Sequence, residues 1–222
     1  MDKTYKIGTR TSPLALKQVE EILGSLKKAR PDFEAEIVGI DTHGDKDRKT
    51  PISSMEGTDF FTREIDEALL KGKIDMAVHS AKDLPDKMTD GLVIAAVTRT
   101  IDPYDVLVSR SGLKLDELPR GARIGTSSQR RKTQLRKYRD DFEIVDIRGN
   151  IEERLELLES LDGIVIAAAG LMRLGLEDRI TQRISLDVLR PHPLQGVLAV
   201  IVRSKDKELI RLLNVLVKKG GV

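Results

Sequence analysis

A basic run at residues 121–139 has the residue types and order of an anion-binding site. The run, GARIGTSSQRRKTQLRKYR, contains seven basic side chains and no acidic one. A strand-like start ends at Gly125, which lets the backbone approach a ligand. Three hydroxyl residues then precede a helical pattern: Thr126, Ser127 and Ser128. Because the N-terminus of a helix favours negative charge, Arg130 and Arg131 in its first turn predict an anionic partner there.

Further arginines follow other expected strand ends. Arg10 lies at the first strand–helix turn, and Ser12 is placed to cap the helix that follows. Residues 148–150 (Arg-Gly-Asn) repeat the pattern with Arg154 close behind, and Arg173 is bracketed by glycines. A solvated arginine beside a capped helix explains the same residues, so a structural and a binding interpretation both stay open. Arginine binds carboxylates and phosphates with two parallel hydrogen bonds, so this set would suit a ligand with several acidic groups.

Lys82 and Asp83 carry the sharpest chemical signal in the chain. They follow the apolar residues 74–78, which read as a buried strand, and so they emerge at the carboxyl edge of a sheet. An ionised aspartate offers only acceptors, so Asp83 can bind N–H donors or stabilise a cation. A structural aspartate that caps the next turn is the competing interpretation. His79 is expected to be a packed residue at the strand end.

The composition is that of a soluble globular protein. Of 222 residues, 40% are hydrophobic and 33% charged, with a formal net charge of +2. No apolar run approaches the ~18 residues of a membrane span and the N-terminus lacks a signal-peptide core, so a cytoplasmic protein without a membrane partner is expected. Cysteine is absent, which excludes disulfides and thiolate sites within these residues. Because His43, His79 and His192 lie far apart, no metal is expected.

Strands alternate with helices along the chain, which predicts an α/β fold with open parallel or mixed sheets. The expected strands cover residues 5–9, 35–40, 74–78, 92–97, 106–108, 123–125, 143–147, 164–168 and 198–202. The expected helices begin at Pro13 and cover residues 61–71, 127–138, 150–161, 170–174 and 205–217 after it. Residues 42–58 are polar and rich in breakers, so we expect a mobile surface loop there.

An echo between the two halves of the chain predicts two similar lobes. Residues 7–9 and 124–126 both read Ile-Gly-Thr, and each triplet precedes a hydroxyl-capped helix. The last strand and helix are expected to return to the first lobe. The domains would then be residues 1–98 with 197–222, and residues 99–196, joined by two hinge crossings near 99–104 and 191–196. Gln195 would be a hinge residue, a ligand contact or both.

Five motifs in order resemble the porphobilinogen deaminase (hydroxymethylbilane synthase) family. They are GTRTSPLALKQ (8–18), HSAKDLP (79–85), GTSSQRR (125–131), RGN with Arg154, and AAAGLMRLGL (167–176), and they run over nearly the whole chain. The resemblance implies two domains, similar to periplasmic binding proteins, that hold a dipyrromethane cofactor. It implies a third domain whose cysteine carries that cofactor. It also implies head-to-tail condensation of four porphobilinogens with ammonia release, in haem (tetrapyrrole) biosynthesis.

The resemblance also assigns roles to residues. Asp83 would be catalytic, holding pyrrole N–H groups and stabilising cationic azafulvene-like intermediates. The cofactor would be bound by Ser80, Lys82, Asp83, Thr126, Ser127, Ser128, Arg130 and Arg131. The substrate or the growing chain would be bound by Arg10, Ser12, Arg148, Asn150, Arg154, Arg173 and Gln195. Each pyrrole ring carries an acetate and a propionate, which accounts for the number of arginines.

Two departures from the family pattern bear on activity. The chain ends close to where the family's third domain would begin and contains no cysteine. Either the third domain was removed or is made separately, in which case a cysteine-bearing domain is expected as a partner, or the chain binds the pigment precursor without the usual anchor. The family's Gly-Lys-Gly ahead of the second helix reads Gly57-Thr58-Asp59, which removes a basic contact. The alternative is a cytoplasmic two-lobed binding protein for a carboxylated small molecule, without catalysis. A nucleic-acid module is disfavoured because Tyr138 is the only aromatic residue of the basic run.

Overall fold

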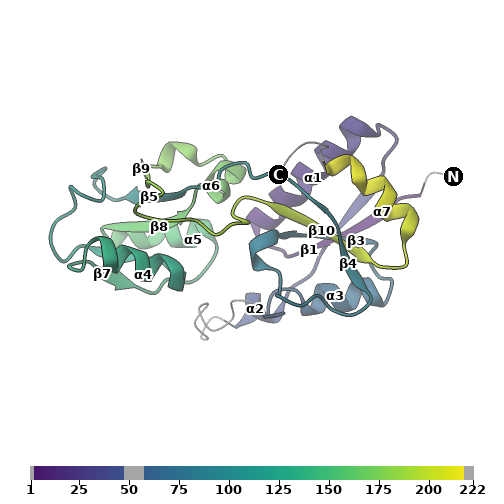
Figure 1. Ribbon diagram of the computed structural model, residues 1–222, viewed down its shortest axis with the longest axis horizontal. Helices are drawn as coiled ribbons and strands as arrows, with labels where there is room; N and C mark the ends of the chain where they lie inside the picture. Colours follow the sequence, from purple (N-terminus) through teal and green to yellow (C-terminus); the bar gives the residue numbers. More distant parts are fainter. Residues whose placement is uncertain (1–2, 48–57, 218–222) are drawn as a thin grey trace. The chain divides into compact units, whose positions relative to one another are not determined.

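A computed structural model describes residues 3–47 and 58–217, which form two compact units (Figure 1). Unit 1 comprises residues 3–47, 58–100 and 197–217, and unit 2 comprises residues 101–196. The chain therefore enters unit 2 after Thr100 and leaves it after Gly196. Unit 1 is assembled from both ends of the sequence.

Unit 1 is built on a mixed five-stranded sheet in the order β2-β1-β3-β10-β4. Its strands are β1 (Tyr5–Thr9), β2 (Ala35–Gly39), β3 (Met76–Ser80), β4 (Leu92–Val97) and β10 (Leu198–Arg203). β1 runs parallel to β2 and β3, whereas β10 runs antiparallel to β3 and β4. Its helices are α1 (Pro13–Ala29), α2 (His43–Lys46), α3 (Arg63–Leu70) and α7 (Lys207–Leu213), with 3-10 turns at η2 (Ala81–Asp83) and η5 (Asn214–Leu216).

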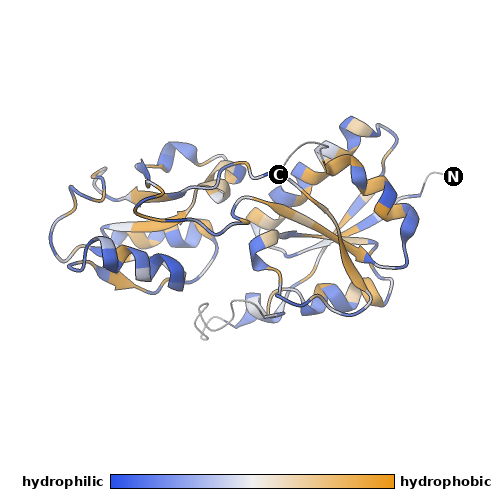
Figure 2. Cartoon of the chain, viewed as in Figure 1, coloured by the Kyte–Doolittle hydropathy of each residue, from blue (hydrophilic) through white to orange (hydrophobic). Residues whose placement is uncertain are grey.

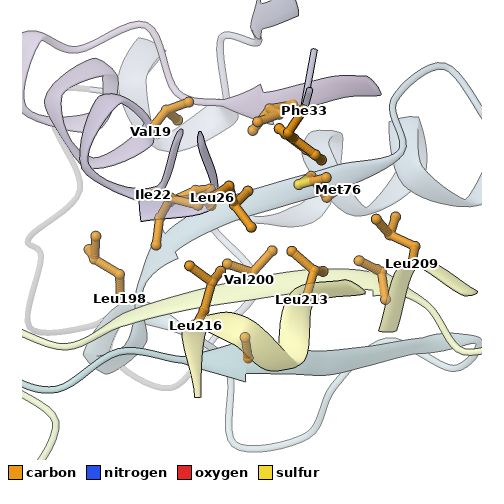
Figure 3. Packing of buried hydrophobic residues seen from close by; sticks show 14 residues of the cluster. Val19, Ile22, Leu26, Phe33, Met76, Leu198, Val200, Leu209, Leu213 and Leu216 are labelled. Carbon is orange, nitrogen blue, oxygen red and sulfur yellow. The ribbon is translucent and has the colours of Figure 1, made fainter. Parts of the chain in front are cut away.

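The apolar residues of α1 recur at helical spacing, and this explains how the helix covers the sheet. Val19, Ile22 and Leu26 are fully buried and pack with β3, β10, α7 and η5 in one cluster (Figure 3). Helices α1 and α7 therefore share one face of the sheet. Ile65 and Leu69 of α3 pack in a separate cluster on the other face.

Unit 2 repeats this architecture in a sheet ordered β7-β6-β8-β5-β9. Its strands are β5 (Asp105–Ser109), β6 (Arg123–Gly125), β7 (Glu143–Val145), β8 (Gly163–Ala167) and β9 (Gln182–Arg183). β6 is parallel to β7 and β8, and β5 is antiparallel to β8 and β9. Its helices are α4 (Gln129–Tyr138), α5 (Ile151–Glu156) and α6 (Ala168–Leu174), with η3 (Leu157–Glu159) and η4 (Glu177–Arg179).

The faces of the second sheet are covered by different helices. Leu135 of α4 joins the core on one face, and Leu155 of α5 and Leu171 of α6 join the core on the other. The central strands of both units are mainly hydrophobic (Figure 2). β8 is buried at four consecutive positions, as expected for a strand covered on both sides.

The Ile-Gly-Thr triplet that both units contain has a packing reason at its glycine. A Cβ on Gly8 of β1 would lie 2.2 Å from Ile74 Cδ1, and one on Gly125 of β6 would lie 2.7 Å from Leu161 Cδ1. Ile74 and Leu161 each lie two residues before the next strand of their sheet. Close packing in the core is therefore a reason for glycine at Gly125, besides the approach of a ligand that its sequence position predicts.

The α/β class with open mixed sheets is confirmed, with local corrections. β3 extends to Ser80 because Ser80 pairs with Leu198 of β10, so His79 and Ser80 are strand residues. The segment expected to be a loop contains α2, while residues 48–57, and with them Gly57, lie outside the described part of the chain. β9 was not predicted, since two residues carry no periodicity.

Arg203 joins the end of β10 to α3. Its Nη1 donates hydrogen bonds to the carbonyl oxygens of Leu69 and Ile74, each at 2.7 Å. Its Nη2 lies 2.7 Å from a carboxylate oxygen of Asp206. Arg203 therefore adds a second donor to the Leu69 carbonyl at the end of α3, which also accepts from the backbone N–H of Gly72 at 3.0 Å, and ties the following turn to the sheet.

Candidate functional site

Hydroxyl residues gather at the carboxyl edge of the unit 2 sheet. Thr126, Ser127 and Ser128 follow β6, whose parallel neighbours end at the same edge. Thr126 is fully buried, and its Oγ1 has no hydrogen-bond partner among the described residues. Ser128 is the N-cap of α4, but within the described chain its side chain makes no capping hydrogen bond, contrary to expectation. Unused hydroxyls beside a helix N-terminus can serve an anionic ligand.

A buried aspartate fills the anionic role that Arg130 and Arg131 predicted. Asp105 is fully buried and pairs with Ala167, which places it at the edge where β8 ends. Its Oδ2 accepts from Nη2 of Arg130 at 2.7 Å, and its Oδ1 accepts from Nε of Arg131 at 2.9 Å. Burial raises the pKa of Asp105, but the charges and hydrogen bonds of Arg131 and Arg130 outweigh burial and lower it. The only sequence signal for Asp105 is a charge at the head of an apolar strand.

The two arginines differ in burial. Arg131 is 6% exposed, donates Nη1 to the carbonyl of Val165 at 3.3 Å and donates Nη2 to Gln195 Oε1 at 3.4 Å. The Arg130 side chain is 25% exposed and donates Nη1 to the carbonyl of Arg190. Arg131 is therefore enclosed by the protein, while Arg130 reaches solvent.

The segment that leads out of unit 2 is tied to the same cluster. Gln195 is buried and donates Nε2 to the carbonyl of Pro103 at 2.7 Å and to Asp105 Oδ1 at 3.0 Å. Arg173 of α6 donates Nη2 to the carbonyl of Gly196 at 3.0 Å. Gly196 has φ +79°, which favours glycine there. Two residues expected to bind substrate thus also hold the chain at this exit.

Asn150 caps α5, as predicted. Its Oδ1 accepts from the backbone N–H of Glu153, and Glu153 Oε2 accepts from the backbone N–H of Asn150, each at 2.8 Å. Gly149 has φ +98°, and a Cβ there would lie 2.5 Å from Glu153 Oε2, so the turn and the cap both require glycine. Arg154 donates Nε to the Gly149 carbonyl at 2.8 Å. Arg148 is half-buried at the same edge.

Acidic residues elsewhere in unit 2 neutralise much of the basic run. Five of its seven basic side chains form ion pairs. The pairs are Arg123 with Glu143, Arg130 and Arg131 with Asp105, Lys132 with Asp146, and Arg139 with Asp141. This pairing weakens the positive potential that a nucleic-acid site would need.

In unit 1, Arg10 is held by Asp45 and Phe61. Arg10 donates Nε to Asp45 Oδ1 at 3.0 Å, and its guanidinium carbon lies 4.5 Å from the centroid of the Phe61 ring. Asp45 also completes a capping box with Thr42 at the start of α2. Burial raises the pKa of Asp45, but hydrogen bonding and charge from Arg10 lower it below its ordinary value. Sequence reasoning missed Asp45 and Phe61; the Thr-x-x-Asp spacing was the available signal for Asp45.

Ser12 caps α1, as predicted, because its Oγ accepts from the backbone N–H of Ala15 at 3.3 Å. Ser80 ends β3, and its Oγ accepts from Gln18 Nε2 at 2.9 Å, which ties the strand end to α1. Lys82 is half-buried and Asp83 is exposed in the turn that follows. Asp83 is therefore accessible at the carboxyl edge of β3.

His79 is a packed strand residue, as expected. It is 6% exposed, and its Nε2 has no hydrogen-bond partner in the described residues. Burial and the nearby charge of Arg10 lower the pKa of His79 to about 4. The imidazole is therefore neutral at physiological pH.

The structure thus brings the predicted residues together in two groups, one at the carboxyl edge of each sheet. The unit 1 group contains Arg10, Ser12, Ser80, Lys82 and Asp83. The unit 2 group contains Thr126, Ser127, Ser128, Arg130, Arg131, Arg148, Asn150, Arg154, Arg173 and Gln195. No helix within residues 3–47 and 58–217 is long and apolar enough to cross a bilayer.

Comparisons with known proteins agree with this arrangement. The structure is similar to a periplasmic substrate-binding protein of an ABC transporter from Coxiella burnetii, with a TM-score of 0.56 and 18% identity over 97% of this chain and 93% of that one. This likeness confirms a fold of two lobes like those of periplasmic binding proteins. A porphobilinogen deaminase of Natranaerobius thermophilus is 45% identical over 214 residues, covering 95% of this chain and 69% of that protein.

A porphobilinogen deaminase of Pelotomaculum thermopropionicum is 48% identical over 216 residues, covering 96% of this chain and 69% of that protein. The family model described as "Porphobilinogen deaminase, dipyromethane cofactor binding domain" matches residues 5–211. The match takes in both sheets and both groups of edge residues. The chain therefore belongs to the porphobilinogen deaminase family.

Proposed function

We propose that this chain binds a dipyrromethane and porphobilinogen and catalyses the stepwise head-to-tail condensation of porphobilinogens with release of ammonia. The observation that best supports this is the gathering of arginines, hydroxyls and one exposed aspartate at the carboxyl edges of two similar sheets. Each porphobilinogen carries an acetate and a propionate, so the ligand presents several carboxylates to these donors. Family membership supports the same activity.

The donor set of unit 2 fits the acidic side chains of a dipyrromethane. Thr126 offers a buried hydroxyl with no partner among the described residues. Arg130, four residues later in the sequence, offers a partly exposed guanidinium. We propose that these residues hold the cofactor together with Ser127 and Ser128, and that Arg131 supports the site from the buried side. When bound, the dipyrromethane supplies the primer to which porphobilinogens are added. In unit 1, Ser80 and Lys82 are proposed to contact carboxylates.

Substrate and growing chain are proposed to be held by the remaining edge residues. Arg148 and Arg154 would pair directly with carboxylates, as would Arg10 once it exchanges part of its pairing with Asp45. Four further residues already make internal bonds and would also shape the edge: Ser12, Asn150, Arg173 and Gln195.

Asp83 is proposed as the catalytic residue. Ammonia leaves the aminomethyl carbon of porphobilinogen, and the positive charge that remains is shared with the pyrrole nitrogen. The free α-carbon of another pyrrole attacks that carbon, which neutralises the first ring, and the attacking ring then loses the proton from the α-carbon that formed the new bond. A carboxylate that accepts hydrogen bonds from pyrrole N–H groups stabilises the charge as it develops. Exposure of Asp83 at the end of β3 supports this role.

We further propose that residues 1–98 with 197–222 and residues 99–196 act as two domains. The cysteine that would carry the cofactor must be supplied outside these 222 residues, which contain none. A cysteine-bearing C-terminal domain would be the partner, and the product would enter tetrapyrrole biosynthesis.

Ammonia release tests the proposal. The purified chain is incubated with porphobilinogen, alone and with a separately produced cysteine-bearing C-terminal domain of a relative. We expect release only with that domain. We expect Asp83→Asn and Asp83→Ala to lower the rate about 100-fold or more, as for loss of a group that stabilises transition-state charge. Asp86→Asn, an exposed aspartate three residues on, is the matched control and should keep the rate.

The same experiment separates the alternative of a binding protein without catalysis. That alternative draws support from the absence of cysteine. It requires porphobilinogen binding that Asp83→Ala leaves intact, with no ammonia release in either mixture. Wild-type turnover by Asp83→Ala would refute the catalytic assignment of Asp83.

A further inference from the structure

Asp105 is bonded to two residues of the proposed cofactor site but cannot touch a ligand itself. Its side chain is 0% exposed. Its two carboxylate oxygens bind Arg130 and Arg131 separately, with donor–acceptor distances of 2.7 and 2.9 Å. A third donor, Nε2 of Gln195, reaches the same Oδ1 at 3.0 Å. Any influence of Asp105 on binding must therefore pass through its partners.

Arg131 and Arg130 differ in the N–H donors that they can still offer to a ligand. Arg131 uses three of its five N–H groups inside the protein, for Asp105, the Val165 carbonyl and Gln195, and at 6% exposure its other two are enclosed as well. Arg130 uses one N–H for Asp105 and one for the Arg190 carbonyl, out of the five that a guanidinium has. Of the pair, Arg130 is thus the residue with donors to offer a carboxylate.

We propose that Asp105 is the positioning residue of the anion site in unit 2. It binds the inner edge of both guanidinium groups, fixes Arg131 as an internal support and directs the remaining donors of Arg130 to a carboxylate of the ligand. Holding a long side chain in one rotamer before binding removes an entropic cost from the binding step. The inference rests on the proposed function, because it assumes that the site takes pyrrole carboxylates.

Asp102 provides a matched control for a purely structural effect. It lies in the same segment, is 7% exposed, and accepts from the backbone N–H of Tyr104 at 2.8 Å and from Arg183 Nε at 3.1 Å. Asp102→Asn should lower the melting temperature, since it removes a buried ion-pair partner. It should leave the affinity for the dipyrromethane within about twofold, since neither of these bonds involves the α4 arginines.

The experiment is calorimetric titration of a free dipyrromethane that carries acetate and propionate side chains into the full chain, at a temperature where every variant is folded. Asp105→Glu keeps the charge but lengthens the side chain, and Asp105→Asn keeps the shape but removes the charge. We expect each to raise Kd about tenfold or more, a loss similar to that of one charge-assisted hydrogen bond. If Asp105→Asn fails to fold because Arg131 loses its counter-ion, Asp105→Glu carries the test.

A double-mutant cycle shows whether Asp105 acts through Arg130. Arg130→Gln should weaken binding by itself, and adding Asp105→Glu to it should change Kd no further. An unchanged Kd for Asp105→Glu, or a full additional loss in the Arg130→Gln background, would overturn the inference and leave the proposed function standing. Failure of the wild-type chain to bind the dipyrromethane would overturn both.

Discussion

Replacing Gly125 by alanine tests whether this glycine serves the core or the ligand. The added Cβ would lie 2.7 Å from Leu161 Cδ1, 2.9 Å from Ile147 Cγ2 and 3.1 Å from Ile164 Cγ2. These distances are too short for carbon atoms, and Gly125 is not among the glycines with positive φ, so the cost is steric. Overpacking of this kind costs about 1–3 kcal/mol. The melting temperature should fall by about 2–4 °C for each kcal/mol lost.

Urea unfolding followed by circular dichroism measures the change. Gly24→Ala in α1 is the control, because no described atom lies within 4 Å of its added Cβ. This control should gain about 0.5–1 kcal/mol from helix propensity. Leu161→Val combined with Gly125→Ala removes the nearest clash, so the double variant should be more stable than the sum of the two single effects predicts.

Binding of a free dipyrromethane that carries acetate and propionate side chains decides between the two explanations. If the core explanation holds, folded Gly125→Ala binds with nearly unchanged affinity. A variant with wild-type stability but weakened binding would refute the packing argument and restore the close-approach role inferred from the sequence.

Three further predictions concern stability. Arg203→Met removes its hydrogen bonds to the carbonyls of Leu69, which keeps the Gly72 N–H, and of Ile74, and should cost about 1–3 kcal/mol in urea unfolding, whereas Arg211→Met on exposed α7 surface should cost little. Because burial holds the pKa of His79 at about 4, the unfolded chain takes up a proton that the folded chain refuses. Stability should therefore fall by about 3 kcal/mol as pH drops from 6.5 towards 4, and His79→Gln should abolish this slope. Burial raises the pKa of Asp66 above 3.8, although Thr89 donates a hydrogen bond to it. Protonated Asp66 therefore stabilises the folded chain at low pH, and this stabilisation is lost as pH rises through the folded pKa. Asp66→Asn should flatten a plot of unfolding free energy against pH in that range.

Local patterns predicted much of the fold and the position of the candidate site. Ser12 followed by Pro13 marked the start of α1, and Asn150 marked the cap of α5, because caps depend on residues within one turn. Strand ends followed by Arg, Ser or Asp located both carboxyl edges. These features need no knowledge of distant partners.

Long-range pairing accounts for what the sequence did not reveal. Asp105 meets Arg130 across 25 residues and Arg10 meets Asp45 across 35 residues, so the arginines read as unpaired until the fold was known. The packing role of Gly125 could not be read from the sequence because its neighbour Leu161 is far away in the chain. β3 seemed to stop early because its last pairing partner, Leu198, comes from the end of the sequence.

The place of β10 between β3 and β4 sets an order for folding during translation. Unit 2 is fully synthesised once residue 196 has left the ribosome, whereas the sheet of unit 1 must wait for Leu198–Arg203. Until then, β3 has one open edge and β4 has no neighbour, which leaves a nascent surface open to unwanted pairing. The half of the protein that is made first is therefore the half that is completed last.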